Sequence, residues 1–396
     1  MRRLGGKRLG LFLGLALMVL AGSGIAASLL WPRIPYPATP VPVLRLAPDA
    51  PFSARLTAPR DGMTALPARI TGRTAAAKTP GAVMHEWPGL HAEAHFHASA
   101  VTLRLNDSVD HWRISLDGGW VEVARPGQKD LRIEGLPPGE HLIRAERISE
   151  SRGPAEFDGF FVDSAGAVRP APPPLARLIE FIGDSDTVGF GNTAQRRDCS
   201  SEQIFSATDT SLSFPARVAA AFDADYRIVA RSGLGLLRNY GGAAPDRTMP
   251  ALYPLALPSD PAAARLPEQR ADLLVIGLGS NDFGSDIAAG EPWPDAARLS
   301  QDFGPALIRF AQARLDEHPG AALILLAFGE YGDDLVRPYR EAAGALAAKG
   351  DTRVGLVVLP DLQRTACLWH PSLKDHAMIA EKLDKAIRDT LPGWNG

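Results

Sequence analysis

The sequence predicts a two-domain protein in which an all-β domain precedes an α/β domain built on a parallel sheet. In the first half of the chain, short alternating strands are separated by frequent turns. The second half alternates apolar runs of buried-strand length with helix-like stretches. A chain of 396 residues is long enough for two such domains. Charged residues make up 22% and hydrophobic residues 45%, as in ordinary soluble globular proteins.

The all-β domain is predicted over residues 68–168. Residues 101–105 alternate apolar and polar side chains, as a half-buried strand does. Two further strands, 111–116 and 120–124, flank Asp117-Gly118-Gly119, which suits positive φ angles and therefore a hairpin. Short strands with frequent turns are typical of a β-sandwich of the jelly-roll kind.

The α/β domain is predicted over residues 177–392, after a Pro-rich joint at residues 169–176. Its expected strands are 178–182, 226–230, 273–277, 322–328 and 353–359. Its expected helices include 214–222, 303–317, 338–349 and 373–390. Strand–helix alternation favours a parallel sheet covered on both faces. Ligands of such folds bind beyond the carboxyl ends of the strands.

The N-terminus predicts export. Residues 1–8 carry four basic side chains, residues 9–22 are uncharged and largely apolar, and small residues follow. Apolar character resumes at residues 28–31, so segment 1–30 is either a cleaved signal peptide or an uncleaved anchor, the only membrane attachment expected. In both cases the rest of the chain is periplasmic or extracellular. A Pro/Ala-rich linker is expected over residues 31–67.

Charge and cysteine content narrow the function further. The formal net charge is −3 and no basic block lies beyond the N-terminus, so the chain lacks the electrostatic signature of nucleic-acid binding. The two cysteines are Cys199 and Cys367. In an oxidising compartment an isolated pair predicts one disulfide, and two unrelated buried thiols are the alternative.

Residues suited to catalysis follow several of the predicted strands. Gly183-Asp184-Ser185 follows the first strand, and its serine hydroxyl needs a positioned base to act as a nucleophile. Ser232-Gly233 follows the second strand and Gly279-Ser280-Asn281-Asp282 the third. A glycine N–H and an asparagine amide at the serine's edge are suitable donors to an oxyanion. Trp369-His370-Pro371, after the last strand, returns a histidine to the same edge.

These blocks, in this order, resemble those of the SGNH (GDSL-type) hydrolases, whose catalytic domain has a flavodoxin-like parallel sheet. The upstream β-domain, Gly191-Asn192, Arg238-Asn239-Tyr240 and Trp369-His370-Pro371-Ser372 make the chain similar to carbohydrate esterase family 2, which is acetylxylan esterase-like, over residues 70–390. That family pairs a jelly-roll domain with an SGNH domain and deacetylates polysaccharides such as xylan and glucomannan. The resemblance therefore implies an exported serine esterase that removes acetyl groups from an acetylated carbohydrate.

The resemblance also implies roles for individual residues. Ser185 corresponds to the nucleophile and His370 to the general base. The backbone N–H groups of Ser185 and Gly233 and the side chain of Asn281 correspond to an oxyanion hole. Such an acyl transfer through an acetyl-enzyme needs neither a metal nor an organic cofactor.

Other residues are expected to support this machinery. Trp369 matches an aromatic that stacks on sugar rings in the family. Asp184 and Asp282 are expected to support their loops through hydrogen bonds and not to transfer protons in the reaction. His376 lies where a helix starts, and we interpret it as a structural residue.

Two positions depart from the SGNH pattern. The aspartate usual two or three residues before the histidine is replaced by Leu368 and Cys367. We therefore expect a Ser-His dyad with a backbone carbonyl orienting the imidazole, Asp361 being the other acidic candidate. The second departure is Asp186, where an apolar residue is usual. We expect its carboxylate to face solvent or to pair with an arginine.

Three alternatives compete with this interpretation. A metal site at His91, His95 and His97 is not expected, because only the last two would share a strand face and no carboxylate cluster accompanies them. A lipase-like acylhydrolase acting on lipid or peptidoglycan acyl groups is a second possible enzyme. A catalytically inactive carbohydrate-binding protein is a third alternative, suggested by the lost aspartate and by Asp186.

Overall fold

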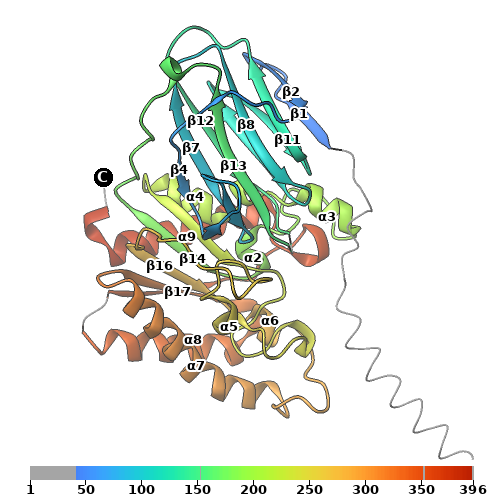
Figure 1. The fold of residues 1–396 in the computed structure, drawn as a ribbon. Helices are drawn as coiled ribbons and strands as arrows, with labels where there is room; N and C mark the ends of the chain where they lie inside the picture. The colour runs from blue at the N-terminus through green and yellow to red at the C-terminus, as the bar shows by residue number, and fades with distance from the viewer. Residues whose placement is uncertain (1–41, 152, 351–352, 395–396) are drawn as a thin grey trace, which may run out of the picture. The chain divides into compact units, whose positions relative to one another are not determined.

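The computed structural model describes residues 42–151, 153–350 and 353–394 (Figure 1). The predicted signal peptide or anchor, residues 1–30, lies outside the described residues. Among the residues that are described, no helix has the length and apolar character needed to cross a bilayer.

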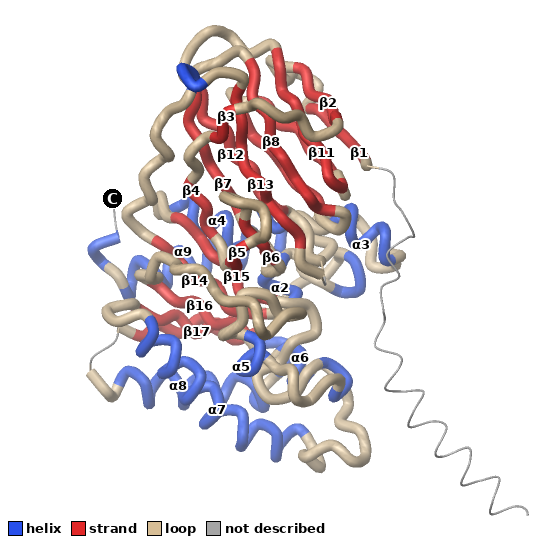
Figure 2. The backbone as a smooth tube through the Cα atoms, viewed as in Figure 1, coloured by secondary structure: helices blue, strands red, loops and turns tan. Residues whose placement is uncertain are grey.

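The first part of the described chain forms two antiparallel sheets (Figure 2). One sheet consists, in spatial order, of β1 (Val43–Leu46), β10 (Gly119–Ala124), β9 (His111–Leu116), β12 (His141–Arg147), β7 (His91–Phe96) and β4 (Arg69–Thr71). The other consists of β2 (Ser53–Thr57), β11 (Gly127–Glu134), β8 (Ala100–Asp107), β13 (Ala155–Val162), β6 (Val83–His85) and β5 (Thr74–Ala76), with β3 (Thr64–Ala65) paired to β13.

The core of this β-sandwich follows from the alternation in its strands. On β8, Val101, Leu103 and Leu105 are buried, and they pack with Trp112 of β9 and with other inward side chains of both sheets. Burying one face of each sheet removes the apolar surface from water. The predicted hairpin is also present, because residues 117 and 118 both have positive φ between β9 and β10.

The predicted linker over residues 31–67 is wrong in its second half. Strands β1, β2 and β3 lie within it and pair with β10, β11 and β13. All four side chains of β1, an edge strand, are exposed, so β1 lacks the alternation that identifies a strand in a sequence. The β-sandwich therefore begins well before residue 68.

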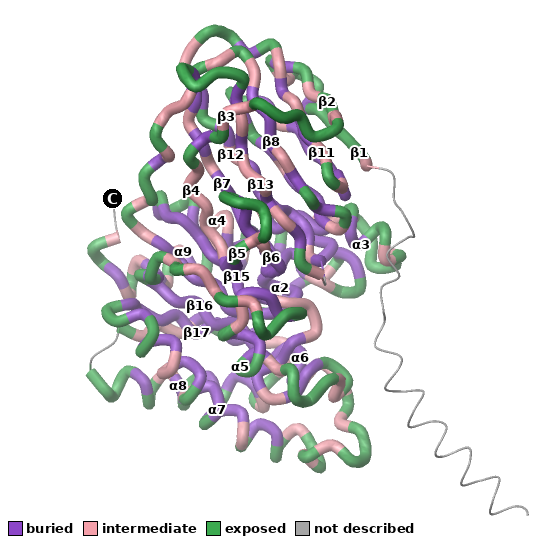
Figure 3. Tube along the Cα trace, in the orientation of Figure 1, coloured by how far each residue is buried: buried purple, intermediate pink, exposed green. Residues whose placement is uncertain are grey.

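The second part of the chain forms a five-stranded sheet whose paired strands are all parallel. In spatial order it consists of β15 (Asp225–Ala230), β14 (Leu178–Gly183), β16 (Leu273–Gly277), β17 (Ala322–Phe328) and β18 (Val354–Leu359). Every residue of β14, β15, β16 and β17 is buried (Figure 3). A sheet covered on both faces favours apolar strands, and the buried charges Glu180 of β14 and Arg227 of β15 pair with each other.

Helices cover both faces of this sheet. The helices of this part of the chain are α2 (Ser185–Val188), α3 (Ser201–Ala207), α4 (Phe214–Ala221), α5 (Met249–Leu252), α6 (Ser280–Phe283), α7 (Ala296–Glu317), α8 (Asp333–Ala347) and α9 (Leu373–Thr390). Short 3₁₀ helices are η1 (Ala165–Ala167), η2 (Thr210–Leu212), η3 (Tyr240–Gly242), η4 (Gly329–Tyr331), η5 (Cys367–Trp369) and η6 (Pro392–Trp394). Helices α7 and α8 pack together on one face, and α4 packs with α9 on the other (Figure 1).

The arrangement determines where a site can form. Strands β14, β15 and β16 end in register, with Gly183 opposite both Ala230 and Gly277. The loops that follow them therefore leave the sheet at the same edge, which we call the carboxyl edge. The predicted site residues lie in these loops and in the loop after β18.

Candidate active site

Ser185 is the first residue of α2, directly beyond the end of β14. Asp184 caps this one-turn helix, because its Oδ1 accepts a hydrogen bond from the Asp186 N–H at 3.0 Å. Gly183 is required here, since a Cβ at that position would clash with the Thr187 hydroxyl. The serine is therefore held at the carboxyl edge by a sharp strand-to-helix turn.

The backbone amides of Ser185 and Gly233 lie in neighbouring loops at this edge. Gly233 follows β15, and its φ of 84° is in the left-handed region that favours glycine. Across the described part of the chain, neither of these two N–H groups has a hydrogen-bond acceptor. Two backbone donors without acceptors at a strand edge are suited to binding a developing negative charge.

Asn281 lies in α6, beyond the end of β16, and joins the neighbouring loops. Its Nδ2 donates to Asp184 Oδ2 at 3.0 Å and to the Leu234 carbonyl at 2.9 Å. Both amide hydrogens are therefore used within the site. An oxyanion contact from Asn281 requires one of these two bonds to be shared or exchanged.

Asp184 and Asp282 are buried and accept hydrogen bonds within the loops. Asp184 Oδ2 accepts from the Ser280 hydroxyl as well as from Asn281, and burial together with the nearby Asp186 charge raises the pKa of Asp184. Asp282 accepts from the backbone N–H groups of residues 236–238 at 2.7 to 2.9 Å. Burial raises the pKa of Asp282 to about 6, against these three bonds.

His370 is oriented by main-chain carbonyls. Its Nδ1 lies 2.9 Å from the Cys367 oxygen and 3.1 Å from the Leu368 oxygen. A carbonyl only accepts, so Nδ1 carries the ring proton and Nε2 is the basic nitrogen. Burial lowers the pKa of His370, and the Asp186 carboxylate partly opposes that shift. The imidazole is therefore a neutral base near pH 7.

Several contacts bring His370 next to the segment that starts at Ser185. The rings of Phe190 and His370 lie 4.3 Å apart between centroids, and the Phe190 N–H donates to the Ser185 carbonyl. The predicted disulfide between Cys199 and Cys367 is present and ties the chain after α2 to the turn before the histidine. Nucleophile and base candidates thus lie on one side of the domain.

Asp361 and His376, two other titratable residues singled out in the sequence, form no hydrogen bond with the His370 ring. Asp361 is exposed and, within the described residues, makes no side-chain hydrogen bond or ion pair, so it does not orient the imidazole. His376 is buried at the start of α9, where its Nδ1 accepts the Phe214 N–H at 3.2 Å. Burial lowers the pKa of His376 to about 4, as expected for a neutral ring joining two helices.

Asp186 does not face solvent. It is buried and pairs with Arg364, whose Nη2 lies 2.7 Å from its Oδ2. Burial by itself would raise the pKa of Asp186, but the guanidinium outweighs burial and lowers it. The carboxylate next to the nucleophile candidate is therefore ionised and neutralised by an arginine.

Two aromatic side chains are exposed near the edge. Trp369 is 61% exposed and Tyr240 is 53% exposed, so neither belongs to the core. The Tyr240 N–H donates to the Gly233 carbonyl, and the Arg197 guanidinium lies 5.7 Å from the Trp369 ring centroid. The sequence assigned Tyr240 no role of its own, although it belongs to the Arg238-Asn239-Tyr240 block.

The β-sandwich contributes carboxylates to the loop after β15. Glu150 accepts hydrogen bonds from both the N–H and the hydroxyl of Ser232, the N–H at 2.7 Å. Glu86 accepts from Arg231 Nη1 at 3.0 Å. These residues hold the loop that precedes Gly233. Sequence reasoning missed them because they lie about 80 to 145 residues away from their partners.

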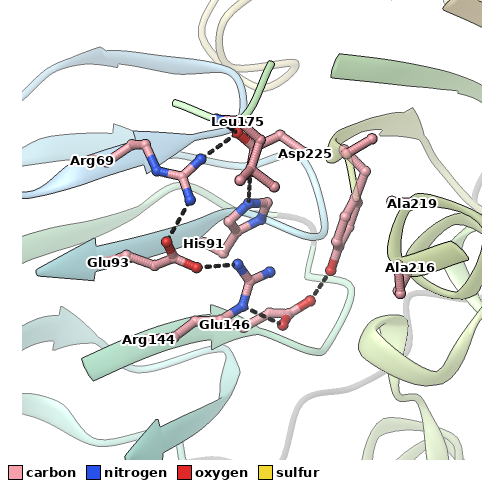
Figure 4. Close-up of a pocket in the computed structure, with 12 residues that line it drawn as sticks. Arg69, His91, Glu93, Arg144, Glu146, Leu175, Ala216, Ala219 and Asp225 are labelled. Carbon is pink, nitrogen blue, oxygen red and sulfur yellow. Dashed lines mark hydrogen bonds and ion pairs between the residues drawn. The ribbon is translucent and has the colours of Figure 1, made fainter. Parts of the chain in front are cut away.

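A separate polar cavity of about 240 Å³ lies at the opposite end of β15 (Figure 4). We call it the junction pocket, because β-sandwich residues line it together with α4 and the start of β15. Its polar lining consists of Arg69, His91, Glu93, Arg144, Glu146, Asp225 and Tyr226. Asp225 is the first residue of β15, so this pocket lies at the amino end of the strand, away from Ser185.

One buried group in the β-sandwich has potential metal ligands. His85, Asp107 and Asp110 bring ligand atoms within 4.8 Å of one another. The Arg147 Nε lies 2.8 Å from Asp110 Oδ1, and the Trp112 indole donates to Asp107 at 2.6 Å. Because a guanidinium already neutralises one carboxylate, we interpret the group as an internal ion pair of the sandwich.

The fold and the carboxyl edge together define an SGNH hydrolase domain behind a jelly-roll domain. Residues 70–172 match the family model described as the carbohydrate esterase 2 N-terminal domain. An acetylxylan esterase/glucomannan deacetylase of Cellvibrio japonicus is 33% identical over 339 residues, which cover 84% of this chain and 94% of that protein. The chain belongs to carbohydrate esterase family 2, and it is a carboxylic ester hydrolase.

Solved structures support the same relationship. A carbohydrate esterase whose active site is described as having divergent catalytic and non-catalytic binding functions is 31% identical, with a TM-score of 0.76 over 84% of this chain and all of that one. A family 2 carbohydrate esterase from Clostridium thermocellum, solved with cellohexaose, is 26% identical, with a TM-score of 0.70 over 83% of this chain and 99% of that one.

Proposed function

We propose that this protein is an exported serine esterase that removes O-acetyl groups from a polysaccharide or oligosaccharide of the xylan or glucomannan kind. The carrying observation is the orientation of His370, whose Nδ1 proton is bound by two carbonyls beside the segment of Ser185. The name of the Cellvibrio japonicus relative, acetylxylan esterase/glucomannan deacetylase, favours an acetylated carbohydrate. The disulfide and the N-terminal sequence favour an oxidising compartment outside the cytoplasm.

The first half of the reaction acylates the enzyme. His370 Nε2 takes the proton of the Ser185 hydroxyl as its oxygen attacks the acetyl carbonyl carbon. The Ser185 and Gly233 N–H groups bind the oxyanion, and Asn281 contributes by sharing one of its amide hydrogens. The carbon–oxygen bond to the sugar then breaks, and the sugar oxygen leaves with the proton from His370.

The second half hydrolyses the acetyl-enzyme. His370 takes a proton from water, the resulting oxygen attacks the same carbonyl, and Ser185 leaves with that proton. Acetate is released and the enzyme returns to its starting state. Each step is a proton or acyl transfer, and none requires a cofactor.

The enzyme works as a dyad in this proposal. The Cys367 and Leu368 carbonyls fix the ring tautomer, which is the orienting role that a triad aspartate has in related hydrolases. Much of the rate enhancement of serine hydrolases is independent of that acid and comes from the oxyanion hole and substrate binding. The missing aspartate is therefore compatible with activity.

Exposed aromatic side chains favour a sugar substrate. Trp369 lies next to the base and Tyr240 follows the loop of Gly233, so each offers a flat apolar surface beside the reacting groups. The competing function is a lipase-like acylhydrolase. Comparing hydrolysis of 4-nitrophenyl acetate and 4-nitrophenyl octanoate separates the two, since a lipolytic enzyme favours the longer chain.

The decisive experiment combines one variant with a set of substrates. Acetate release is measured from acetylated xylan, acetylated glucomannan and acetylated peptidoglycan, with the wild type and S185A. We expect the wild type to release acetate from a plant polysaccharide and S185A to release none above background. Acetate release by S185A at the wild-type rate, or no release by the wild type, would contradict the proposal.

A further inference from the structure

Arg364 connects three separate segments at the carboxyl edge. It lies between β18 and η5, six residues before His370. Its Nη1 and Nη2 donate to the two carboxylate oxygens of Asp186 at 3.0 and 2.7 Å. Its Nε donates to Glu330 Oε1 at 2.6 Å, and Nη1 also donates to the Trp369 carbonyl at 3.3 Å. One side chain therefore contacts the nucleophile's helix, η4 and the residue before the base.

The arginine itself is firmly held. Its φ is 47°, and its N–H donates to Asp375 Oδ2 at the start of α9. Its carbonyl accepts a hydrogen bond from Arg197 Nε at 2.8 Å. The guanidinium is largely buried, with 14% of the side chain exposed against 3% for Asp186. The pair is an internal connection and not a surface ion pair.

The presence of Asp186 requires an explanation. A carboxylate beside the nucleophile disfavours an oxyanion nearby, and burying it costs free energy unless it is paired. Arg364 removes both penalties with a bidentate ion pair, the geometry in which arginine binds carboxylates most strongly. The same arginine reaches the Trp369 carbonyl, so the pair connects the two catalytic segments directly.

We propose that Asp186 and Arg364 are positioning residues that lock the helix of Ser185 to the loop of His370, where this chain lacks the acid that SGNH enzymes usually carry before the histidine. The inference rests on the proposed function and adds to it the means by which nucleophile and base are kept in register. Glu330 supports the pair from η4 by binding Arg364.

The pair also provides a readout that a purely structural role lacks. The charged and titratable groups facing His370 are Asp186 from α2, Arg364 from its own loop and His376 from α9. Burial lowers the pKa of His370, Asp186 raises it and Arg364 lowers it. Removing the carboxylate should therefore move the acidic limb of kcat/KM to lower pH, whereas removing the arginine should move it to higher pH.

The test is a double-mutant cycle of D186L, R364M and the double variant, assayed with 4-nitrophenyl acetate. R364M leaves a buried carboxylate unpaired, so we expect kcat to fall about 100-fold with KM changed less than about twofold. D186L should lower kcat about 10-fold. The kcat of the double variant should also fall only about 10-fold, because no unpaired charge remains.

A matched control is R104M in the β-sandwich. Arg104 also binds a buried aspartate with two nitrogens, at 2.7 and 3.0 Å from the oxygens of Asp130. R104M should lower Tm without changing kcat. If R364M does not fold, R364K replaces it, since lysine keeps the charge without the planar fork and should give an intermediate kcat.

Three results would overturn the inference: an R364M kcat equal to that of the wild type, losses that multiply independently in the double variant, or acidic limbs that do not move. S185A is assayed alongside as a reference. If S185A keeps esterase activity, the proposed function fails. If S185A is inactive and the cycle shows no coupling, the positioning role alone fails.

Discussion

The two ends of β15 carry polar clusters of opposite character. At its amino end, the junction pocket contains charges that neutralise one another: Arg69 binds Glu93 and Asp225, and Arg144 binds Glu93 at 2.7 Å (Figure 4). At its carboxyl end, the Gly233 N–H has no acceptor among the described residues, and His370 keeps its basic nitrogen available. The charges at the amino end are paired with one another and contribute structure, whereas the Gly233 N–H and the basic nitrogen of His370 are available for chemistry.

This contrast leads to a rule that can be tested on single residues. Breaking a buried ion pair leaves an uncompensated charge and costs stability. Removing a catalytic atom that has no partner costs activity and changes stability less, because no buried charge is left uncompensated. Variants at the two ends of β15 should therefore separate on a plot of Tm against kcat.

The largest effect is expected from H370N. Loss of the general base should lower kcat for 4-nitrophenyl acetate by about 10³- to 10⁴-fold, while the thermal unfolding midpoint stays close to that of the wild type. Steady-state kinetics together with circular dichroism melting measures both quantities. A variant that keeps a tenth of the activity would show that His370 is not the base.

The junction pocket should behave in the opposite way. R69M removes the cation shared by Glu93 and Asp225, so we expect the free energy of unfolding to fall by about 3 kcal/mol. The kcat per folded molecule should not change. Urea unfolding and active-site-normalised kinetics check the two statements, and a selective loss of kcat would place the junction pocket in the catalytic machinery.

A smaller effect is expected where the β-sandwich meets the carboxyl edge. E150Q weakens the two hydrogen bonds that hold Ser232 beside Gly233, so the oxyanion donor should be less well positioned. We expect kcat to fall about 10-fold with little change in KM. The matched variant E156Q, on β13 of the same sandwich, should leave kcat unaltered. Equal rates for both would mean that the sandwich does not influence the reaction.

The effect on substrate binding of removing Trp369 should be smaller than the effect of E150Q on kcat. W369A removes an exposed stacking surface worth about 1 kcal/mol, so KM for the polysaccharide should rise about fivefold. The kcat/KM for 4-nitrophenyl acetate, which has no sugar ring, should be nearly constant. A parallel loss on both substrates would assign Trp369 to loop structure instead.

The pH dependence gives the mildest test. His370 must be neutral to act as a base, and its pKa is lowered by burial. The acidic limb of kcat/KM should therefore lie below the ordinary histidine value of about 6.5, with activity lost only as the pH falls through that lowered pKa. A limb above pH 7 would contradict the electrostatics of the site.

Local patterns predicted much of the α/β domain. The bounds of β16, β17 and α9 match those expected from apolar runs and from a helix-like stretch. Helix α8 is expected from the sequence to begin at Pro338, but it begins five residues earlier, at Asp333. The proline therefore lies inside the helix. Proline has no N–H to donate to the carbonyl of Asp334, four residues earlier. That carbonyl accepts a hydrogen bond from the Ser300 hydroxyl instead. That bond comes from another helix and is invisible in a local window.

The order of strands and helices follows from local patterns in the chain, and the meeting of four loops at one edge follows from that order, because parallel strands end together whatever their side chains do. The choice of partners among the groups at that edge depends on how the layers pack. Asp186 and Arg364 are separated by 178 positions, and Glu150 and Ser232 by 82. Periodicity reports on neighbours in the chain, whereas ion pairs depend on distances that exist only after the layers have packed.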